Sequence, residues 1–118
     1  MWGAKGPEAF DCSGLVTYSL AQVGITFPDG TANQWPRIVD AGTTVNLDTA
    51  IDTYGALLFR MGTNPNHVAI SLGDGNTIEA RGSSYGVGIF PARQGRSWTG
   101  AGTVPELAHA LQQLEATR

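Results

Sequence analysis

The hydrophobic and polar positions near the start of the chain follow a helical period over residues 11–23. Val16 and Leu20 fall on one face of this segment. Asp11 is well suited to cap its N-terminus, because a carboxylate there can accept hydrogen bonds from the free N–H groups of the first turn. Gly24 favours a helix end just beyond the segment. The pattern therefore predicts a helix that begins directly after Asp11.

Short strands and one more helix are predicted for the rest of the chain. Residues 25–54 show no clean period and predict irregular structure. Residues 57–59 are typical of a buried strand, and residues 87–90 predict another. A final helix opens near Pro105 and carries an apolar stripe of leucines, Leu107, Leu111 and Leu114. One helix followed by short antiparallel strands indicates an α+β fold.

The alternation over residues 67–81, around a Gly-Asp-Gly turn, is typical of a β-hairpin. Its apolar residues can share one face only if Ile70 lies opposite Ile78, since a slip of one residue would reverse one strand. This register places Glu79 on the same face of the sheet as His67, within reach of the imidazole. The core of the hairpin therefore predicts a His–Glu pair.

Composition narrows the class of protein. A chain of 118 residues is long enough for one domain with a single core. Its content of 42% hydrophobic and 14% charged residues predicts a folded chain. The net charge of -3 argues against a nucleic-acid-binding protein, which would need a basic face. The apolar runs are too short to cross a membrane.

Cys12 is the only cysteine, so no internal disulfide is possible. An arbitrary lone cysteine is more often a small buried hydrophobe than a nucleophile. Here, however, the thiol is predicted at a helix N-terminus, where the helix dipole favours the thiolate. Its pKa is therefore expected below the ordinary value of about 8.5.

A partner base would make this thiol a nucleophile, and the chain contains two histidines. His109 falls in the predicted C-terminal helix, where a solvated surface position is expected. His67 opens the hairpin and is the candidate base, with Glu79 as the group that orients it. One cysteine and two separated histidines offer no zinc-binding spacing, and no metal or organic cofactor is expected.

Three motifs, in order, resemble the NlpC/P60 family of cell-wall cysteine peptidases. They are FDCSGLV at residues 10–16, a Gly-x-Leu-Leu-Phe strand at residues 55–59, and HVAISLGDGNTIEA at residues 67–80. The dipeptide at residues 2–3 is similar to the end of the Tyr-x-Trp-Gly stretch that precedes the cysteine in this family. The resemblance implies a papain-like fold with the cysteine helix packed on an antiparallel sheet. It also implies hydrolysis of peptidoglycan stem peptides, commonly between D-γ-glutamyl and a diamino acid.

The resemblance also implies residue roles. Cys12 matches the nucleophile, His67 the base and Glu79 the third, orienting position. Asp11 and Ser13 flank the nucleophile and match candidates for gripping the amine end of the substrate. The backbone N–H of Cys12 is the expected oxyanion donor.

Two positions depart from the family pattern. The aromatic residue expected two positions before Trp2 is absent from this chain, and with it a helper tyrosine of many members. Ala56 stands where the family usually has Asp after glycine, which we interpret as the loss of a structural hydrogen bond.

The domain organisation expected from the sequence is a peptidase domain at residues 1–98, followed by a Gly-rich connection and C-terminal helix at residues 99–118. This segment predicts a larger, multidomain parent protein. The protein is expected at the cell wall or outside the cell, or in a virion if it is phage-encoded, because a wall hydrolase must act outside the cytoplasm; no signal peptide is visible in the chain. An autolysin, an endolysin and a phage tail protein all fit.

Two other functions fit the same residues. The domain could be a degenerate one that binds wall peptides or another protein without cutting. It could also be an amidase or acyltransferase, because a Cys-His-Glu arrangement specifies only acyl transfer.

Overall fold

The computed structural model describes residues 11–63, 66–81 and 86–109. Within these ranges the elements are α1 (Cys12–Ala21), α2 (Thr31–Ala41), α3 (Leu47–Ile51), β1 (Leu57–Arg60), β2 (His67–Ser71), β3 (Asn76–Ala80), β4 (Val87–Pro91) and β5 (Gly100–Gly102). Residues 105–109 are also helical. Of the leucine stripe predicted for the last helix, Leu107 lies in this helical segment, whereas Leu111 and Leu114 lie outside the described residues.

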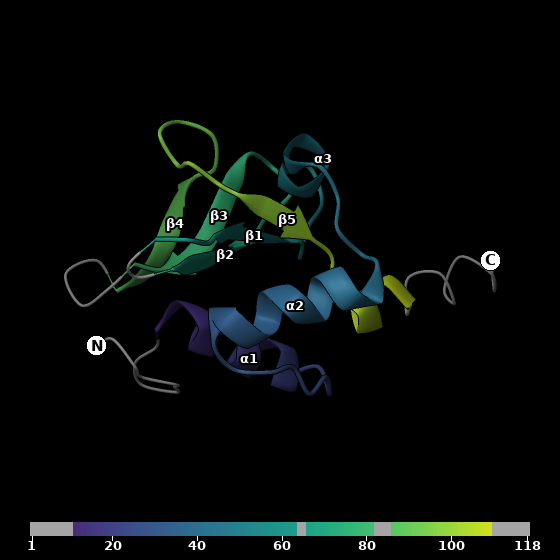
Figure 1. Cartoon of the computed structure of the whole chain (residues 1–118). Helices are drawn as coiled ribbons and strands as arrows, with labels where there is room; N and C mark the ends of the chain where they lie inside the picture. The colour runs from purple at the N-terminus through teal and green to yellow at the C-terminus, as the bar shows by residue number, and fades with distance from the viewer. Residues whose placement is uncertain (1–10, 64–65, 82–85, 110–118) are drawn as a thin grey trace.

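The strands form one antiparallel sheet in the order β4-β3-β2-β1-β5. Helices α1 and α2 lie on one face of this sheet, and α3 lies on the other (Figure 1). The predicted α+β fold, with the cysteine-bearing helix packed on an antiparallel sheet, is confirmed.

Helix α1 begins where the sequence predicts. The Asp11 backbone is extended, and its carboxylate accepts a hydrogen bond from the Gly14 N–H at 2.7 Å. This bond satisfies one of the free donors of the first turn. The chain leaves the helix through Gly24, whose φ of 81° suits glycine. The Asp11 cap thus makes Cys12 the first residue of the helix.

The prediction of irregular structure over residues 25–54 is wrong for two segments, which form α2 and α3. Local signals for both are present but weak. In α2, Ala32, Trp35 and Ile38 recur at helical spacing and Gly42 ends the helix, but Gly30 offers no side-chain cap and Pro36 interrupts the segment. Helix α3 is capped by the Asn46 side chain, but it is only five residues long. Burial of Ile38 and Ile51 against the sheet stabilises the two helices.

The hairpin has the predicted register, with Ile70 paired to Ile78 and Ser71 to Thr77. Its turn requires glycine for two reasons. Gly73 has a φ of 78°, and a Cβ there would lie 2.9 Å from the backbone nitrogen of Tyr54. The prediction that fixes the positions of His67 and Glu79 on the sheet is therefore confirmed.

Strand β5 shows why glycines gather near the end of the chain. It pairs with β1, and a Cβ on Gly100 would lie 2.5 Å from the Trp35 ring of α2. A Cβ on Gly102 would collide with Ile38. The sequence places these glycines in a connecting segment, but in the structure they let α2 approach the edge of the sheet. Continuation into a larger parent protein stays a prediction.

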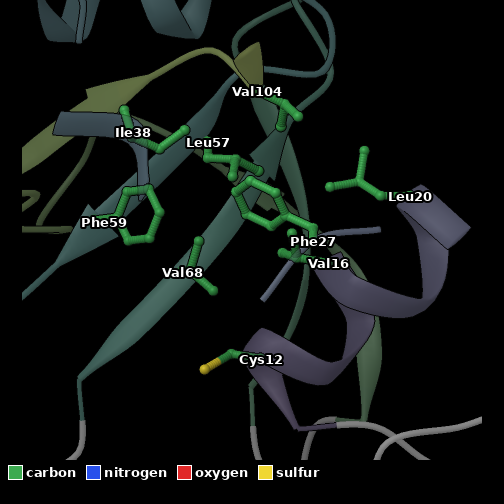
Figure 2. Packing of buried hydrophobic residues seen from close by; sticks show 9 residues of the cluster. All are labelled: Cys12, Val16, Leu20, Phe27, Ile38, Leu57, Phe59, Val68 and Val104. Carbon is green, nitrogen blue, oxygen red and sulfur yellow. The ribbon is translucent and has the colours of Figure 1, made fainter. Parts of the chain in front are cut away.

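Apolar side chains cover both faces of the sheet, rather than forming the single core that the chain length predicts. The larger cluster, shown in Figure 2, lies between the sheet and the helices α1 and α2, and Cys12 is at its edge. It contains Leu57 and Phe59 of β1, whereas Leu58 packs with α3 on the opposite face. No helix in the described ranges is long and apolar enough to span a bilayer.

Candidate active site

His67 and Glu79 are in direct contact across strands β2 and β3. The distance from Nε2 of the imidazole to Oε1 of the carboxylate is 2.8 Å, and both residues are buried. An ionised carboxylate can only accept a hydrogen bond, so Nε2 carries the hydrogen. In neutral His67 this assignment leaves the lone pair on Nδ1, the form in which an imidazole can accept a proton there.

The Glu79 carboxylate is fully buried and receives three donors. Arg96 Nη2 lies 2.5 Å from Oε1, which also accepts from His67, and the Thr77 hydroxyl donates to Oε2. Burial alone would raise the pKa of Glu79, but these hydrogen bonds and the positive charge of Arg96 lower it to about 2. Glu79 is therefore ionised at neutral pH although water does not reach it.

This lowered pKa predicts a specific sensitivity to acid. Because the pKa falls from 4.5 to about 2 on folding, the ionised carboxylate stabilises the fold fully above pH 4.5. That contribution, about 3 kcal/mol, is lost as the pH falls towards 2. We expect the free energy of unfolding to decrease over this range, and Glu79→Gln to lose this part of the decrease. Denaturant unfolding between pH 2 and 6 measures the effect.

Glu106→Gln is the matched control for this measurement, since Glu106 forms a half-exposed ion pair with Arg37 at 3.1 Å. Its acid dependence should resemble that of the parent protein. Parallel curves for the parent and Glu79→Gln would contradict the low pKa.

Arg96 and Trp98 complete the surroundings of the pair, and sequence reasoning missed both. The Trp98 ring stacks on the His67 ring, with centroids 6.1 Å apart and an angle of 17° between planes. The guanidinium carbon of Arg96 lies over the Trp98 ring, 4.7 Å from the ring centroid. These residues follow β4 in a segment without periodicity, so no sequence pattern marks them. The available signal was physical: a buried glutamate needs a cation.

Cys12 lies against the backbone on either side of His67. Its Sγ is 3.9 Å from the Asn66 carbonyl oxygen and is also within reach of the Val68 backbone N–H. The side chain is 4% exposed. Helix α1 and strand β2 thus bring the thiol next to the residue that carries the imidazole.

The predicted low pKa of the thiol is wrong for this structure. Burial raises the pKa of Cys12 and outweighs the hydrogen bond from Val68, and the neighbouring Asp11 carboxylate raises it further. The helix N-terminus was expected to dominate, but the sequence does not reveal how deeply the sulfur is buried. Cys12 is therefore a neutral thiol at rest, and any nucleophilic role requires a base to remove its proton.

Asp11 and Ser13 are both buried beside Cys12. The Asp11 carboxylate caps α1, and the Ser13 hydroxyl lies 3.4 Å from it and 3.4 Å from the Asp29 carboxylate. The structure therefore places two carboxylates and a hydroxyl around the start of α1. A role for Asp11 and Ser13 in substrate binding stays a prediction.

His109 is exposed, as the sequence predicts. No group of three or more His, Cys, Asp or Glu side chains within residues 11–63, 66–81 and 86–109 could hold a metal ion.

Comparison with known proteins identifies a family. The sequence pattern of the NlpC/P60 family matches residues 1–101. The chain is 31% identical over 86 residues to the probable endopeptidase p60 of Listeria grayi, and 38% identical over 85 residues to the peptidoglycan endopeptidase RipB of Mycobacterium tuberculosis. These matches cover 73% and 72% of this chain, but 16% and 33% of the two relatives. The chain thus corresponds to one part of longer proteins.

Solved structures agree with this assignment. The NlpC/p60 domain of the peptidoglycan hydrolase SagA superposes with a TM-score of 0.72 at 33% identity, covering 88% of this chain and 85% of that domain. The structure of RipB from M. tuberculosis gives a TM-score of 0.66 at 35% identity, with 81% of this chain and 45% of RipB covered. Both the sequence and the fold therefore point to the same family.

Proposed function

This chain belongs to the NlpC/P60 family, and from that premise we propose that it is a peptidoglycan hydrolase of the cysteine peptidase type. The observation that carries the proposal is the buried His67–Glu79 contact beside the N-terminus of the helix that begins with Cys12. The names of the relatives, peptidoglycan endopeptidase and peptidoglycan hydrolase, support the substrate class.

In the proposed reaction, Nδ1 of His67 takes the proton of the Cys12 thiol as the sulfur attacks the carbonyl carbon of the scissile peptide bond. The resulting oxyanion accepts a hydrogen bond from the Cys12 backbone N–H, which has no partner within the helix because it lies in the first turn. His67 then donates the proton to the leaving amine, and a thioester remains. Water, deprotonated by His67, hydrolyses the thioester and restores the thiol.

The neutral resting thiol supports a mechanism in which the base acts at the moment of attack. Glu79 holds the Nε2–H tautomer and stabilises the imidazolium that forms when Nδ1 takes the proton. Because Glu79 is ionised down to about pH 2, its charge is available throughout the range in which a histidine titrates.

The proposed bond is the one between D-γ-glutamyl and the diamino acid of the stem peptide, with Asp11 and Ser13 gripping the amine end. The protein would then work at the cell wall or outside the cell, within a larger parent protein. The partial coverage of the curated relatives is consistent with such a parent.

Digestion of purified peptidoglycan sacculi, followed by mass spectrometry of the released fragments, tests this proposal. We expect free stem-peptide fragments that begin at the diamino acid. Fragments cut at the lactyl link would instead identify an amidase. Binding to sacculi without any release, under conditions in which a known hydrolase acts, would identify a binding domain.

A further inference from the structure

We propose that Arg96 is a positioning residue for the reaction, which holds Glu79 in place and limits how strongly the carboxylate attracts a proton onto His67. The inference rests on the proposed function, in which His67 must be neutral to accept the thiol proton. It concerns a residue that does not contact the reacting atoms.

Arg96 is buried beside Glu79 and is held there by two hydrogen bonds. Its Nη2 lies 2.5 Å from the same carboxylate oxygen of Glu79 that accepts from His67, and its Nη1 donates to the Pro91 carbonyl oxygen. Arg96 is 7% exposed and Glu79 is fully buried. An ion pair without solvent is screened far less than one at the surface, so the guanidinium acts strongly on this oxygen.

The backbone around Arg96 is also held in an unusual conformation. Ser97 has a φ of 56° and is the one non-glycine residue in the described ranges with a positive φ. The conformation is costly for a residue with a Cβ. Ser97 lies between Arg96, which pairs with Glu79, and Trp98, which stacks on His67. In addition, Arg60 Nη1 approaches the Arg96 carbonyl oxygen at 3.4 Å. The loop is thus fixed from several sides.

Two further arginines belong to strands and segments next to the His67–Glu79 pair. Arg81, after β3, has its Nε 3.9 Å from Glu79 Oε1, but its side chain is 37% exposed, so solvent screens it. Arg60 of β1 pairs in register with His67. From α1, the sulfur of Cys12 lies 3.9 Å from the carbonyl oxygen of Asn66, the residue before His67. Of these groups, Arg96 is the cation closest to the carboxylate and the most buried.

The sign of the effect follows from Coulomb's law. Glu79 stabilises a protonated His67, and the positive charge of Arg96 opposes this stabilisation. Removing that charge should therefore make His67 hold its proton to higher pH. The base would then become available only at higher pH, although the thiol and the imidazole are untouched.

NMR titration of His67 measures this directly, and His109 serves as an internal reference because it is exposed. In Arg96→Gln we expect the His67 midpoint to rise relative to that of the parent protein. The acidic limb of kcat/KM on peptidoglycan should move in the same direction. Arg96→Lys keeps the charge, so its midpoint should stay near that of the parent while its activity falls several-fold.

Arg93→Gln is the matched control. Arg93 lies in the same segment, is 53% exposed and pairs with Asp48 at 2.6 Å. It should change neither the midpoint nor the pH profile. A uniform loss of activity in both Arg96 variants, without a shift of the His67 midpoint, would overturn the proposal and leave Arg96 a purely structural residue.

The two variants also guard against misfolding. If Arg96→Gln does not fold, Arg96→Lys decides alone, because a shifted His67 midpoint in this charge-preserving variant would overturn the proposal. If the parent protein releases nothing from peptidoglycan, the proposed function fails, whereas the NMR titration still tests the effect of Arg96 on His67.

Discussion

Replacing Cys12 with alanine is expected to reduce the release of fragments from peptidoglycan by roughly 10⁴-fold or more. The reason is chemical, since in the proposed reaction the thiol sulfur is the attacking atom and alanine offers no substitute. The fold should stay near native, because the change removes one atom from a side chain at the edge of the hydrophobic cluster (Figure 2). Fragment release is measured by mass spectrometry, and folding by circular dichroism and thermal unfolding.

Val23→Ala is a suitable control for the Cys12 variant, because Val23 follows the same helix and is 66% exposed. Its activity should match that of the parent protein. Release at the parental rate by Cys12→Ala would refute the nucleophile assignment, even if peptidoglycan hydrolysis itself were established.

Replacing Glu79 with alanine is expected to lower kcat/KM by roughly 10³- to 10⁴-fold, because His67 then loses both its orientation and the charge that stabilises the imidazolium. Glu79→Gln should be slowed less, since the amide keeps part of the hydrogen bonding to Thr77 and His67. Alanine should also cost stability, about 3 kcal/mol or more, because it leaves the buried Arg96 cation without its partner.

These two consequences can be separated. Activity is measured at a temperature where circular dichroism shows the variant to be folded. A loss of activity at that temperature then reflects lost catalysis and not unfolding. A Glu79→Ala protein that is folded and as active as the parent would contradict the role of Glu79 as the orienting group.

The hairpin was predictable because two independent constraints agree on it. The alternation of apolar residues requires Ile70 opposite Ile78, and a Gly-Asp-Gly turn of the matching length joins the strands. Together they also determine the side of the sheet on which Glu79 lies. The helix beginning at Cys12 was predictable for a similar reason, since the Asp11 cap stands directly before a segment whose Val16 and Leu20 are buried.

Features that depend on packing between distant segments were not predictable. Arg96 reaches Glu79 from a segment 17 residues away in a loop without periodicity. The raised pKa of Cys12 depends on burial by neighbours that the sequence does not identify.

The protonated, buried thiol described above has a consequence for how long the protein survives outside a reducing compartment. Oxidants and disulfides react with the thiolate rather than with the thiol. A lone cysteine that is ionised at rest would be converted step by step to sulfenic and then sulfinic acid. Because burial raises the pKa of Cys12 and leaves the residue 4% exposed, we expect the resting thiol to be oxidised slowly. In the proposed reaction, the sulfur loses its proton only as it attacks the substrate carbonyl.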